Sequence, residues 1–231
     1  MHRPCDFLDE DGECKLVLSG LICLCYNMVK FQIFFGMGIV SLNELLKLSI
    51  EEFFKLRNNS KDRLEYIDGI VYMTPSPSTK HQRISSRLHT KLFNFLEGKE
   101  CEVFHAPFDI ELSKKDQQGN MIKDTKVVIP DLSVICDKTT LGENNYVGSP
   151  ELIIEILSPS NQAHDLVTKL NLHMQYGVEE YWIVNPLLNL EQIYVLDAEG
   201  QYRQLDVLKE TGLAFSAVLK GFNIELEELF K

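Results

Sequence analysis

The sequence lacks the short motifs that identify several common enzyme classes. It contains no G-x-x-x-x-G-K-[ST] phosphate loop, no G-x-G-x-x-G dinucleotide fingerprint, no G-x-S-x-G nucleophile elbow and no H-E-x-x-H zinc motif. It also lacks internal repeats and low-complexity tracts. These absences argue against a P-loop NTPase, a Rossmann dehydrogenase, an α/β-hydrolase and a zincin.

Cysteine pairs of the kind that bind zinc are also missing. None of the six cysteines forms a C-x-x-C pair, and no H-x-x-x-H partner accompanies them. A domain of this size buries enough surface to fold without disulfides. We therefore expect reduced thiols and a cytoplasmic location. The six are Cys5, Cys14, Cys23, Cys25, Cys101 and Cys136.

Positive charge is scarce. The 23 Lys and Arg are outnumbered by 34 Asp and Glu, so the net charge is -11. This argues against a protein that coats nucleic acid non-specifically, because phosphate binding needs cations. It does not exclude a nuclease, since carboxylates that hold a metal add negative charge and a local basic face still binds the backbone.

Residues 1–48 are predicted to form an accessory or disordered N-terminal extension. The acidic start is opposite to the basic start of a signal peptide. The apolar stretch Leu16–Val40 is long enough for a membrane helix, but Asn27 and Lys30 interrupt it. We therefore favour an extension over a membrane anchor and predict no membrane partner.

The remaining residues, 49–231, read as one domain. Ser49–Glu52 has the pattern of a capping box and predicts a short helix. Leu64–Met73 predicts a hairpin around Asp68-Gly69, and Lys80–Glu97 predicts an amphipathic helix. Further strands are expected at 103–112, 127–136, 151–157 and 181–184, a hairpin at 192–207, and a helix from 158 to 176. This order predicts an α/β fold with a central mixed β-sheet flanked by helices.

Two carboxylates fall inside apolar strands. Asp131 follows Pro130 and opens Leu132–Ile135, and Glu155 lies within Leu152–Leu157. A carboxylate in a buried strand is costly unless it is paired or binds a cation. On consecutive strands the two can converge at one end of the sheet, where hard oxygen ligands suit Mg²⁺ or Mn²⁺. For either residue alone, a salt-bridged acid at a strand edge is the simpler interpretation.

The helix after the second of these strands carries a candidate cation. Asp165, Lys169 and His173 are spaced i, i+4 and i+8, so they share one helix face. A surface salt bridge between Asp165 and Lys169 is the alternative interpretation. We nevertheless favour Lys169 as a site residue, because the site needs a lysine and the apolar strands of Asp131 and Glu155 carry none.

A basic stripe is the best candidate for contacts with a DNA backbone. Lys80, Arg83, Arg87 and Lys91 recur along the predicted helix with no acid among them. His81, at the start of that helix, is a further candidate for a phosphate contact. A solvated helix face and a capping or packing histidine are the alternatives.

The ordered series of these segments resembles a known family. Pro130-Asp131 followed by Glu155-Ile156-Leu157 is similar to the PD-(D/E)XK signature of the restriction-endonuclease-like superfamily. From about residue 50 to 230 the chain more closely resembles the Uma-two family of restriction endonucleases. The matching segments are Glu65–Gly69, Met73–Pro77 with His81, Pro130–Val134, Glu155–Pro159, Asp165–Lys169, Tyr176–Trp182 and Gly221-Phe222.

The resemblance implies a restriction-endonuclease-like core that hydrolyses phosphodiester bonds in DNA with Mg²⁺ or Mn²⁺. It implies that Asp131 and Glu155 are catalytic metal ligands and that Glu65 is an additional ligand. The third signature position is Leu157 instead of lysine, so the catalytic lysine would come from the following helix as Lys169.

Family habit also implies a homodimer, because cutting two strands requires two sites. The alternative, kept open by Leu157 and by the net charge, is a catalytically inactive nuclease-fold module that binds nucleic acid.

Overall fold

The computed structural model describes residues 47–231 except 75, 116–120 and 159–163, together with four short N-terminal strands. These strands pair in one antiparallel sheet: β1 (Lys15–Leu18), β2 (Leu21–Leu24), β3 (Gln32–Phe35) and β4 (Gly38–Ser41). The rest of the predicted extension up to residue 46 lies outside the described residues. Within the described part of the chain, no helix is long and apolar enough to cross a membrane.

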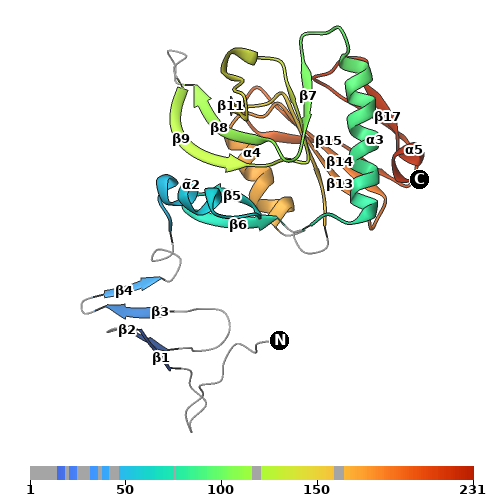
Figure 1. The fold of residues 1–231 in the computed structure, drawn as a ribbon. Helices are drawn as coiled ribbons and strands as arrows, with labels where there is room; N and C mark the ends of the chain where they lie inside the picture. Colours follow the sequence, from blue (N-terminus) through green and yellow to red (C-terminus); the bar gives the residue numbers. More distant parts are fainter. Residues whose placement is uncertain are drawn as a thin grey trace.

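A six-stranded mixed sheet forms the centre of the domain (Figure 1). Its order is β15 (Tyr202–Lys209), β14 (Leu190–Leu196), β13 (Glu180–Asn185), β12 (Leu152–Ile156), β10 (Leu132–Ile135) and β7 (Glu102–His105). The β12–β13 pair is parallel, whereas the other pairs are antiparallel. The predicted mixed α/β class is therefore confirmed.

A second sheet of five strands lies against the first. Its order is β11 (Asn145–Gly148), β8 (Asp109–Lys115), β9 (Met121–Val128), β5 (Arg63–Ile67) and β6 (Ile70–Thr74). The β5–β6 hairpin turns at Asp68-Gly69, as predicted. A small hairpin, β16 (Leu213–Phe215) with β17 (Asn223–Glu225), follows near the C-terminus.

Two segments expected to be single strands each pass from one sheet to the other. The expected strand 103–112 is divided into β7 and β8 around Pro107, and 127–136 is divided into β9 and β10 around Pro130. Proline cannot donate to a strand ladder, so pairing stops there. The two crossings are adjacent, because the Ala106 N–H donates to the Asp131 carbonyl at 3.0 Å.

Helix α2 (Ile50–Asn58) begins at the predicted cap. The Ser49 hydroxyl accepts from the Glu52 N–H at 3.2 Å, and the Glu52 carboxylate accepts from the Ser49 N–H at 2.8 Å. Phe53 is fully buried and packs on Tyr66 of β5, with ring centroids 5.1 Å apart. This contact attaches α2 to the five-stranded sheet.

Helices cover both faces of the six-stranded sheet. Helix α3 (Thr79–Leu96) is capped by Ser78 and buries an apolar face that includes Ile84, Leu88 and Leu92. That face belongs to the same core cluster as Ile154 of β12 and residues of α5 (Leu226–Phe230). On the opposite face, Ile153 of β12 packs in a second cluster that includes Leu172 of α4 (Leu170–Gln175). A π-helical segment, η2 (His164–Lys169), leads into α4; residues 159–163 of the helix expected from 158 to 176 lie outside the described residues.

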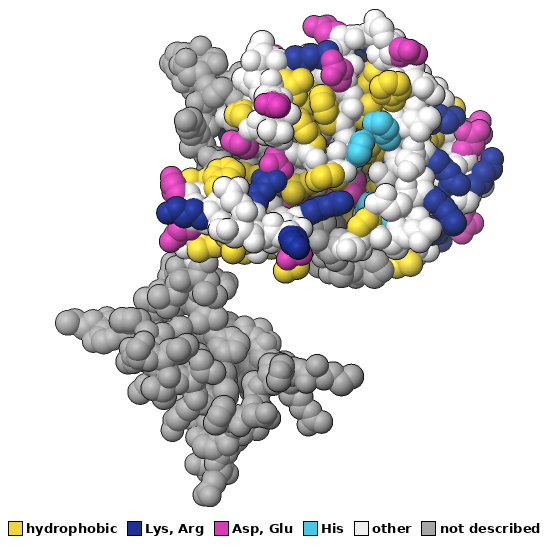
Figure 2. Space-filling model, in the orientation of Figure 1, with side chains coloured by type: hydrophobic (Ala, Val, Ile, Leu, Met, Phe, Trp, Pro, Cys, Tyr) yellow, Lys and Arg dark blue, Asp and Glu magenta, His cyan; other side chains and the backbone are white. Residues whose placement is uncertain are grey.

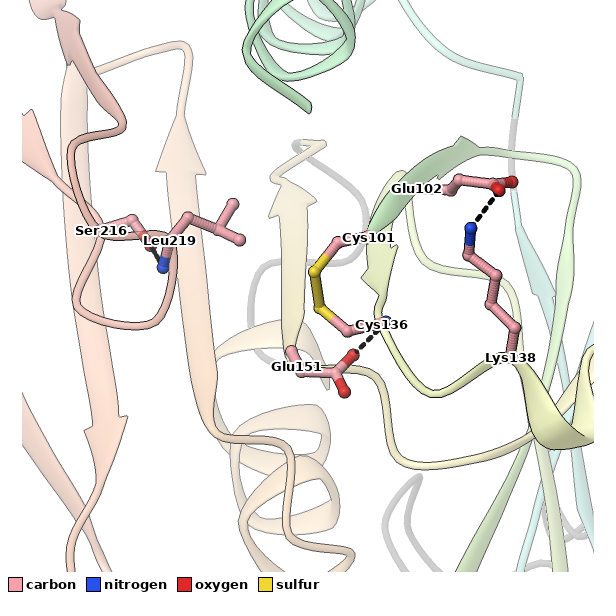
Figure 3. The surroundings of a disulfide bond; sticks show 7 residues. All are labelled: Cys101, Glu102, Cys136, Lys138, Glu151, Ser216 and Leu219. Atoms are coloured by element: carbon pink, nitrogen blue, oxygen red, sulfur yellow. Dashed lines mark hydrogen bonds and ion pairs between the residues drawn. A yellow bond between two sulfur atoms is a disulfide. The ribbon is translucent and has the colours of Figure 1, made fainter. Parts of the chain in front are cut away.

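A disulfide joins the ends of two neighbouring strands (Figure 3). Ile135 of β10 faces Glu102 of β7, so the next residues, Cys136 and Cys101, also face each other, with Cα atoms 4.0 Å apart. The Cys136 N–H donates to Glu151 Oε2 at 2.7 Å. The expectation of reduced thiols is therefore wrong for this pair. Sequence spacing does not reveal that residues 35 positions apart meet across two strands.

Candidate active site

Asp131 lies where the chain passes from the five-stranded sheet into the six-stranded sheet, directly before β10. The ladder between β10 and β12 ends at the pair Leu132 and Ile154. Two residues further along β12, the Ile156 N–H donates to Asp131 Oδ2 at 2.8 Å. The carboxylate thus continues the hydrogen bonding of the ladder, which fixes its position beside β12.

His81 contacts the same carboxylate from the first turn of α3. Its Nε2 lies 3.1 Å from Asp131 Oδ2, and the two side chains are 10% and 18% exposed. With a carboxylate as acceptor, Nε2 carries the proton. The other ring nitrogen, Nδ1, is buried and has no hydrogen-bond partner among the described residues.

Lys169 lies between two buried glutamates. Its amine donates to Glu155 Oε1 at 2.9 Å and to Glu65 Oε1 at 3.1 Å. Glu65 Oε1 also accepts from the Ile129 N–H at 2.8 Å. Buried charges are costly unless they are paired and hydrogen-bonded. The ammonium therefore stabilises both carboxylates, which arrive from different sheets.

The lysine reaches the site from a helix instead of from the strand. Leu157, at the third signature position, is buried in the apolar cluster that contains Leu172 of α4. Lys169 is the last residue of η2, and π-helical turns are frequent at functional sites. The structure places Lys169 beside Glu155, while its catalytic role stays a prediction.

Asp131 and Glu155 are neighbours across the end of the β10–β12 pair. Asp131 binds the backbone N–H of the residue that follows Glu155. Successive side chains of a strand point to opposite faces. Glu155 therefore points to the same face as Ile153, the face that α4 covers. Asp131 lies at the strand end, between this face and the α3 side.

The donor chemistry of this pair fits a magnesium or manganese ion. Mg²⁺ keeps several waters and usually binds through one or two protein carboxylates together with substrate phosphates. Among the described residues, no group of three or more His, Cys, Asp or Glu is arranged to hold a metal ion. The assignment of Asp131 and Glu155 as metal ligands stays a prediction. The carboxylate of Glu65, the predicted additional ligand, directs Oε1 toward Lys169 and the Ile129 N–H, and its contact with a metal stays a prediction.

A cavity of about 280 Å³ opens beside Asp131. We call it the histidine cavity; its wall includes Arg63, His81, Ser85, Ser86, His89, His105 and Asp131. Figure 2 shows histidine side chains in cyan near the middle of one face of the domain, with Lys and Arg side chains in dark blue nearby. The sequence reasoning missed His89, His105 and Arg63. The spacing of His81 and His89, about two helical turns, was the one available signal.

The basic stripe of α3 is largely engaged within the protein. Of its four cations, three contact the turn after β13 or the C-terminal segment. Arg83 is exposed. The contacts are Lys80 with Pro186 O and with Asn189 Oδ1 (3.0 Å), Arg87 with Leu229 O (2.9 Å) and Lys231 O, and Lys91 with Glu228 Oε2 (2.7 Å). The predicted role of Lys80, Arg83 and Arg87 in nucleic-acid binding stays a prediction.

His173 is a core residue and not part of the site surface. It is fully buried in α4, with its ring centroid 4.9 Å from that of Tyr181. Burial, together with the nearby charge of Lys169, lowers the pKa of His173 to about 3. The imidazole is therefore neutral at physiological pH and adds no positive charge next to the lysine.

Three comparisons relate the chain to known proteins. The Uma2 family model, described as "Putative restriction endonuclease", matches residues 50–227. The uncharacterized protein slr1290 of Synechocystis sp. is 28% identical over 178 residues, which cover 74% of this chain and 89% of that protein. A crystal structure described as a putative nuclease belonging to DUF820, from Anabaena variabilis, superposes with a TM-score of 0.62 at 21% identity. That match covers 79% of this chain and 97% of the other and shows a shared fold.

Proposed function

The chain belongs to the Uma2 family, described as "Putative restriction endonuclease", and from this premise we propose that it is a metal-dependent endonuclease acting on DNA. The observation that carries the proposal is the hydrogen bond from the Lys169 amine to Glu155 Oε1, next to the Asp131 carboxylate. Two acids can hold a divalent ion, and a lysine beside them can stabilise the charge that develops in phosphodiester hydrolysis.

In this proposal Asp131 and Glu155 hold a Mg²⁺ or Mn²⁺ ion. A divalent ion there supplies Lewis-acid polarisation of a phosphoryl oxygen and activation of water. The protein's own contribution is to hold the two carboxylates in place. The Ile156 N–H and His81 fix Asp131, and Lys169 fixes Glu155.

In the same proposal, Lys169 stabilises the negative charge that develops during the reaction. Its ammonium is already oriented by two buried carboxylates, so little reorganisation is needed when negative charge develops on the phosphoryl group. Glu65 acts here as a positioning residue for the lysine, because its Oε1 contacts both Lys169 and the Ile129 N–H. This assignment differs from a direct metal contact by Glu65.

DNA as the substrate and a homodimer as the working unit belong to the same proposal. The family description supports the first. The second is proposed from the habit of the family, because one site cuts one strand at a time and two sites would cut both strands together. Sedimentation of the full chain with and without DNA measures the oligomeric state.

The test is cleavage of supercoiled plasmid by the full chain with Mg²⁺, with Mn²⁺ and with EDTA. We expect nicking or linearisation only with a metal. Asp131→Asn and Glu155→Gln should abolish it, because each retains a hydrogen-bond acceptor but removes the negative charge. Glu199→Gln is the matched control, since Glu199 is exposed at the β14–β15 turn.

Two outcomes would contradict the proposal. Cleavage that persists in Asp131→Asn and Glu155→Gln would point to another site or a contaminating nuclease. DNA binding without cleavage under any metal would favour the alternative, a catalytically inactive module of nuclease fold.

A further inference from the structure

The histidine cavity lies next to Asp131, one of the two proposed catalytic carboxylates, but most of its wall has no part in their chemistry. One side is the polar face of α3, with Ser85, Ser86 and His89. The other sides come from His105 at the end of β7 and from Arg63 of β5. A polar cavity with hydroxyl, imidazole and guanidinium donors suits an anionic ligand.

We propose that the histidine cavity binds a phosphate of the nucleic-acid backbone that neighbours the phosphate being cleaved, an inference that rests on the proposed function. Nucleic acids present phosphates in regular succession along each strand. A strand held at Asp131 therefore carries further phosphates past the adjoining cavity. This subsite would position the substrate without reading its bases.

Arg63 supplies the charge that the subsite needs. No salt bridge between described residues involves Arg63. Arg87 of the basic stripe, by contrast, donates to carbonyls of the protein itself. A guanidinium matches phosphate oxygens in a fork geometry. Arg63 is thus a cation at the cavity wall that the rest of the described chain does not neutralise.

The two outer histidines also favour an anion. The His89 and His105 rings meet edge to face, with centroids 4.9 Å apart. Burial, and then the proximity of His105, lowers the pKa of His89. Like charges at this distance oppose each other, and a phosphate bound beside both rings would supply the counter-charge that favours their protonated forms.

A metal is the other ligand that clustered imidazoles suggest. Within the described part of the chain, however, no three His, Cys, Asp or Glu are placed to hold one ion. The Asp131 carboxylate at the inner end repels an anion. The phosphate therefore belongs at the outer end, between Arg63, His89 and His105.

The first test uses inorganic phosphate as the probe and needs no variant. Histidine ring resonances of the isotope-labelled full chain are followed by NMR while phosphate is added in the presence of EDTA. We expect the resonances of His89 and His105 to shift and saturate, and that of the buried His173 to stay. Absence of a saturable shift at His89 and His105 would overturn the inference.

The second test measures binding of a fluorescent oligonucleotide in EDTA, where no cutting occurs. Arg63→Met and His89→Gln should each weaken binding about tenfold, as expected for the loss of a charge-assisted hydrogen bond. Arg63→Met should also lower the slope of log affinity against log salt by about one. Lys209→Met, which removes an exposed lysine of β15, is the matched control and should change the affinity little.

The two tests together distinguish the source of the phosphate. Unchanged oligonucleotide binding in Arg63→Met and His89→Gln would overturn the assignment to a nucleic-acid backbone, even if inorganic phosphate binds. If those variants weaken binding but the chain never cuts DNA, the subsite stands and the proposed function fails. If the chain cuts DNA and both variants keep wild-type kcat and KM, the proposed function stands and the subsite fails.

Discussion

The Lys169 amine donates to Glu155 Oε1 at 2.9 Å, although the two residues lie on different elements and 14 positions apart. The same amine donates to Glu65 Oε1 at 3.1 Å, so the lysine contacts one glutamate from each of the two sheets. All three side chains are buried. The repulsion between two carboxylates in a medium of low dielectric is therefore offset by this one cation.

Replacing Lys169 should destabilise the fold. Lys169→Met leaves Glu65 and Glu155 buried without their shared cation, and we expect the free energy of unfolding to fall by about 3–5 kcal/mol. The double variant Lys169→Met/Glu65→Gln should recover part of that loss, because one uncompensated charge is removed. Urea denaturation measures both effects.

Lys209→Met is the control for that series, since a substitution at an exposed position normally changes stability by about 0.5 kcal/mol or less. The double variant also separates folding from chemistry, because it should regain stability but not cleavage. Wild-type stability in Lys169→Met would show that the lysine does not hold the two glutamates.

Metal binding should depend on the Asp131 charge. Asp131→Asn keeps an oxygen that accepts from the Ile156 N–H, so we expect the fold to be retained. One of two charged ligands is lost, and the affinity for Mg²⁺ or Mn²⁺ should fall by at least about tenfold. Isothermal titration calorimetry on the wild type and the variant measures this without any knowledge of the substrate. Equal affinities would remove Asp131 from the site.

Elements with local signals could be predicted from the sequence. The capping box at Ser49 and the turn at Asp68-Gly69 act through neighbouring residues, and both are confirmed. Strand β11 was not among the expected strands, because its pairing with β8 depends on residues far away in sequence. The disulfide was missed for the same reason, since it depends on the register between β7 and β10.

The sequence indicated which residues form the candidate site, but it did not indicate all the contacts that these residues make. Buried position and spacing singled out Asp131, Glu155 and Lys169, and the structure brings Lys169 to Glu155 and Asp131 to the next backbone N–H. The contact between His81 and Asp131 needed the packing of α3 on the sheet. The engagement of Arg87 by the C-terminal carbonyls could not be foreseen, because a stripe of cations looks the same whether solvent or protein faces it.

Glu191 should make the protein lose stability as pH rises from 4.5 to about 8. It is fully buried on β14, and its carboxylate oxygens have no hydrogen-bond partner among the described residues. Burial, with smaller effects of Asp206 and Glu180, raises its pKa from 4.5 to about 8. Between these two values the folded state keeps a proton that the unfolded state releases. Stability therefore falls as pH rises through this window.

Glu191→Gln tests this directly. The side chain at position 191 then carries no charge at any pH, so the loss of stability with rising pH should disappear. The free energy of unfolding at about pH 9 should rise by an amount on the order of a few kcal/mol. Free energies of unfolding measured from about pH 5 to 9 give the slope. Glu199→Gln, at an exposed site, should keep the wild-type slope. An unchanged slope in Glu191→Gln would contradict the assignment.

His173 should make the protein less stable at acidic pH, which is the opposite of the effect of Glu191. Its pKa is lowered from 6.5 to about 3, so the unfolded state binds a proton that the folded state does not. Stability is therefore full above the unfolded value and is lost as pH falls from 6.5 toward 3. His173→Phe should flatten this limb, because the variant has no imidazole to protonate in either state. Thermal melts across this range measure the difference, and an equal acid slope in His173→Phe would count against it.

Arg83 and Arg87 provide a matched pair for separating stability from nucleic-acid binding. Arg87 donates to the Leu229 and Lys231 carbonyls at the end of α5, where a cation also interacts favourably with the helix dipole. Arg87→Met should therefore lower the free energy of unfolding by about 1–3 kcal/mol, whereas Arg83→Met should change it by about 0.5 kcal/mol or less.

The same two variants decide whether the stripe contacts DNA. A phosphate contact by Arg83 predicts that Arg83→Met reduces the salt slope of oligonucleotide binding by about one while the fold stays intact. A slope that is unchanged in Arg83→Met would assign the stripe to the solvated and structural surface of α3. Backbone binding would then depend on the histidine cavity and its Arg63, because three of the four stripe cations already contact the protein itself.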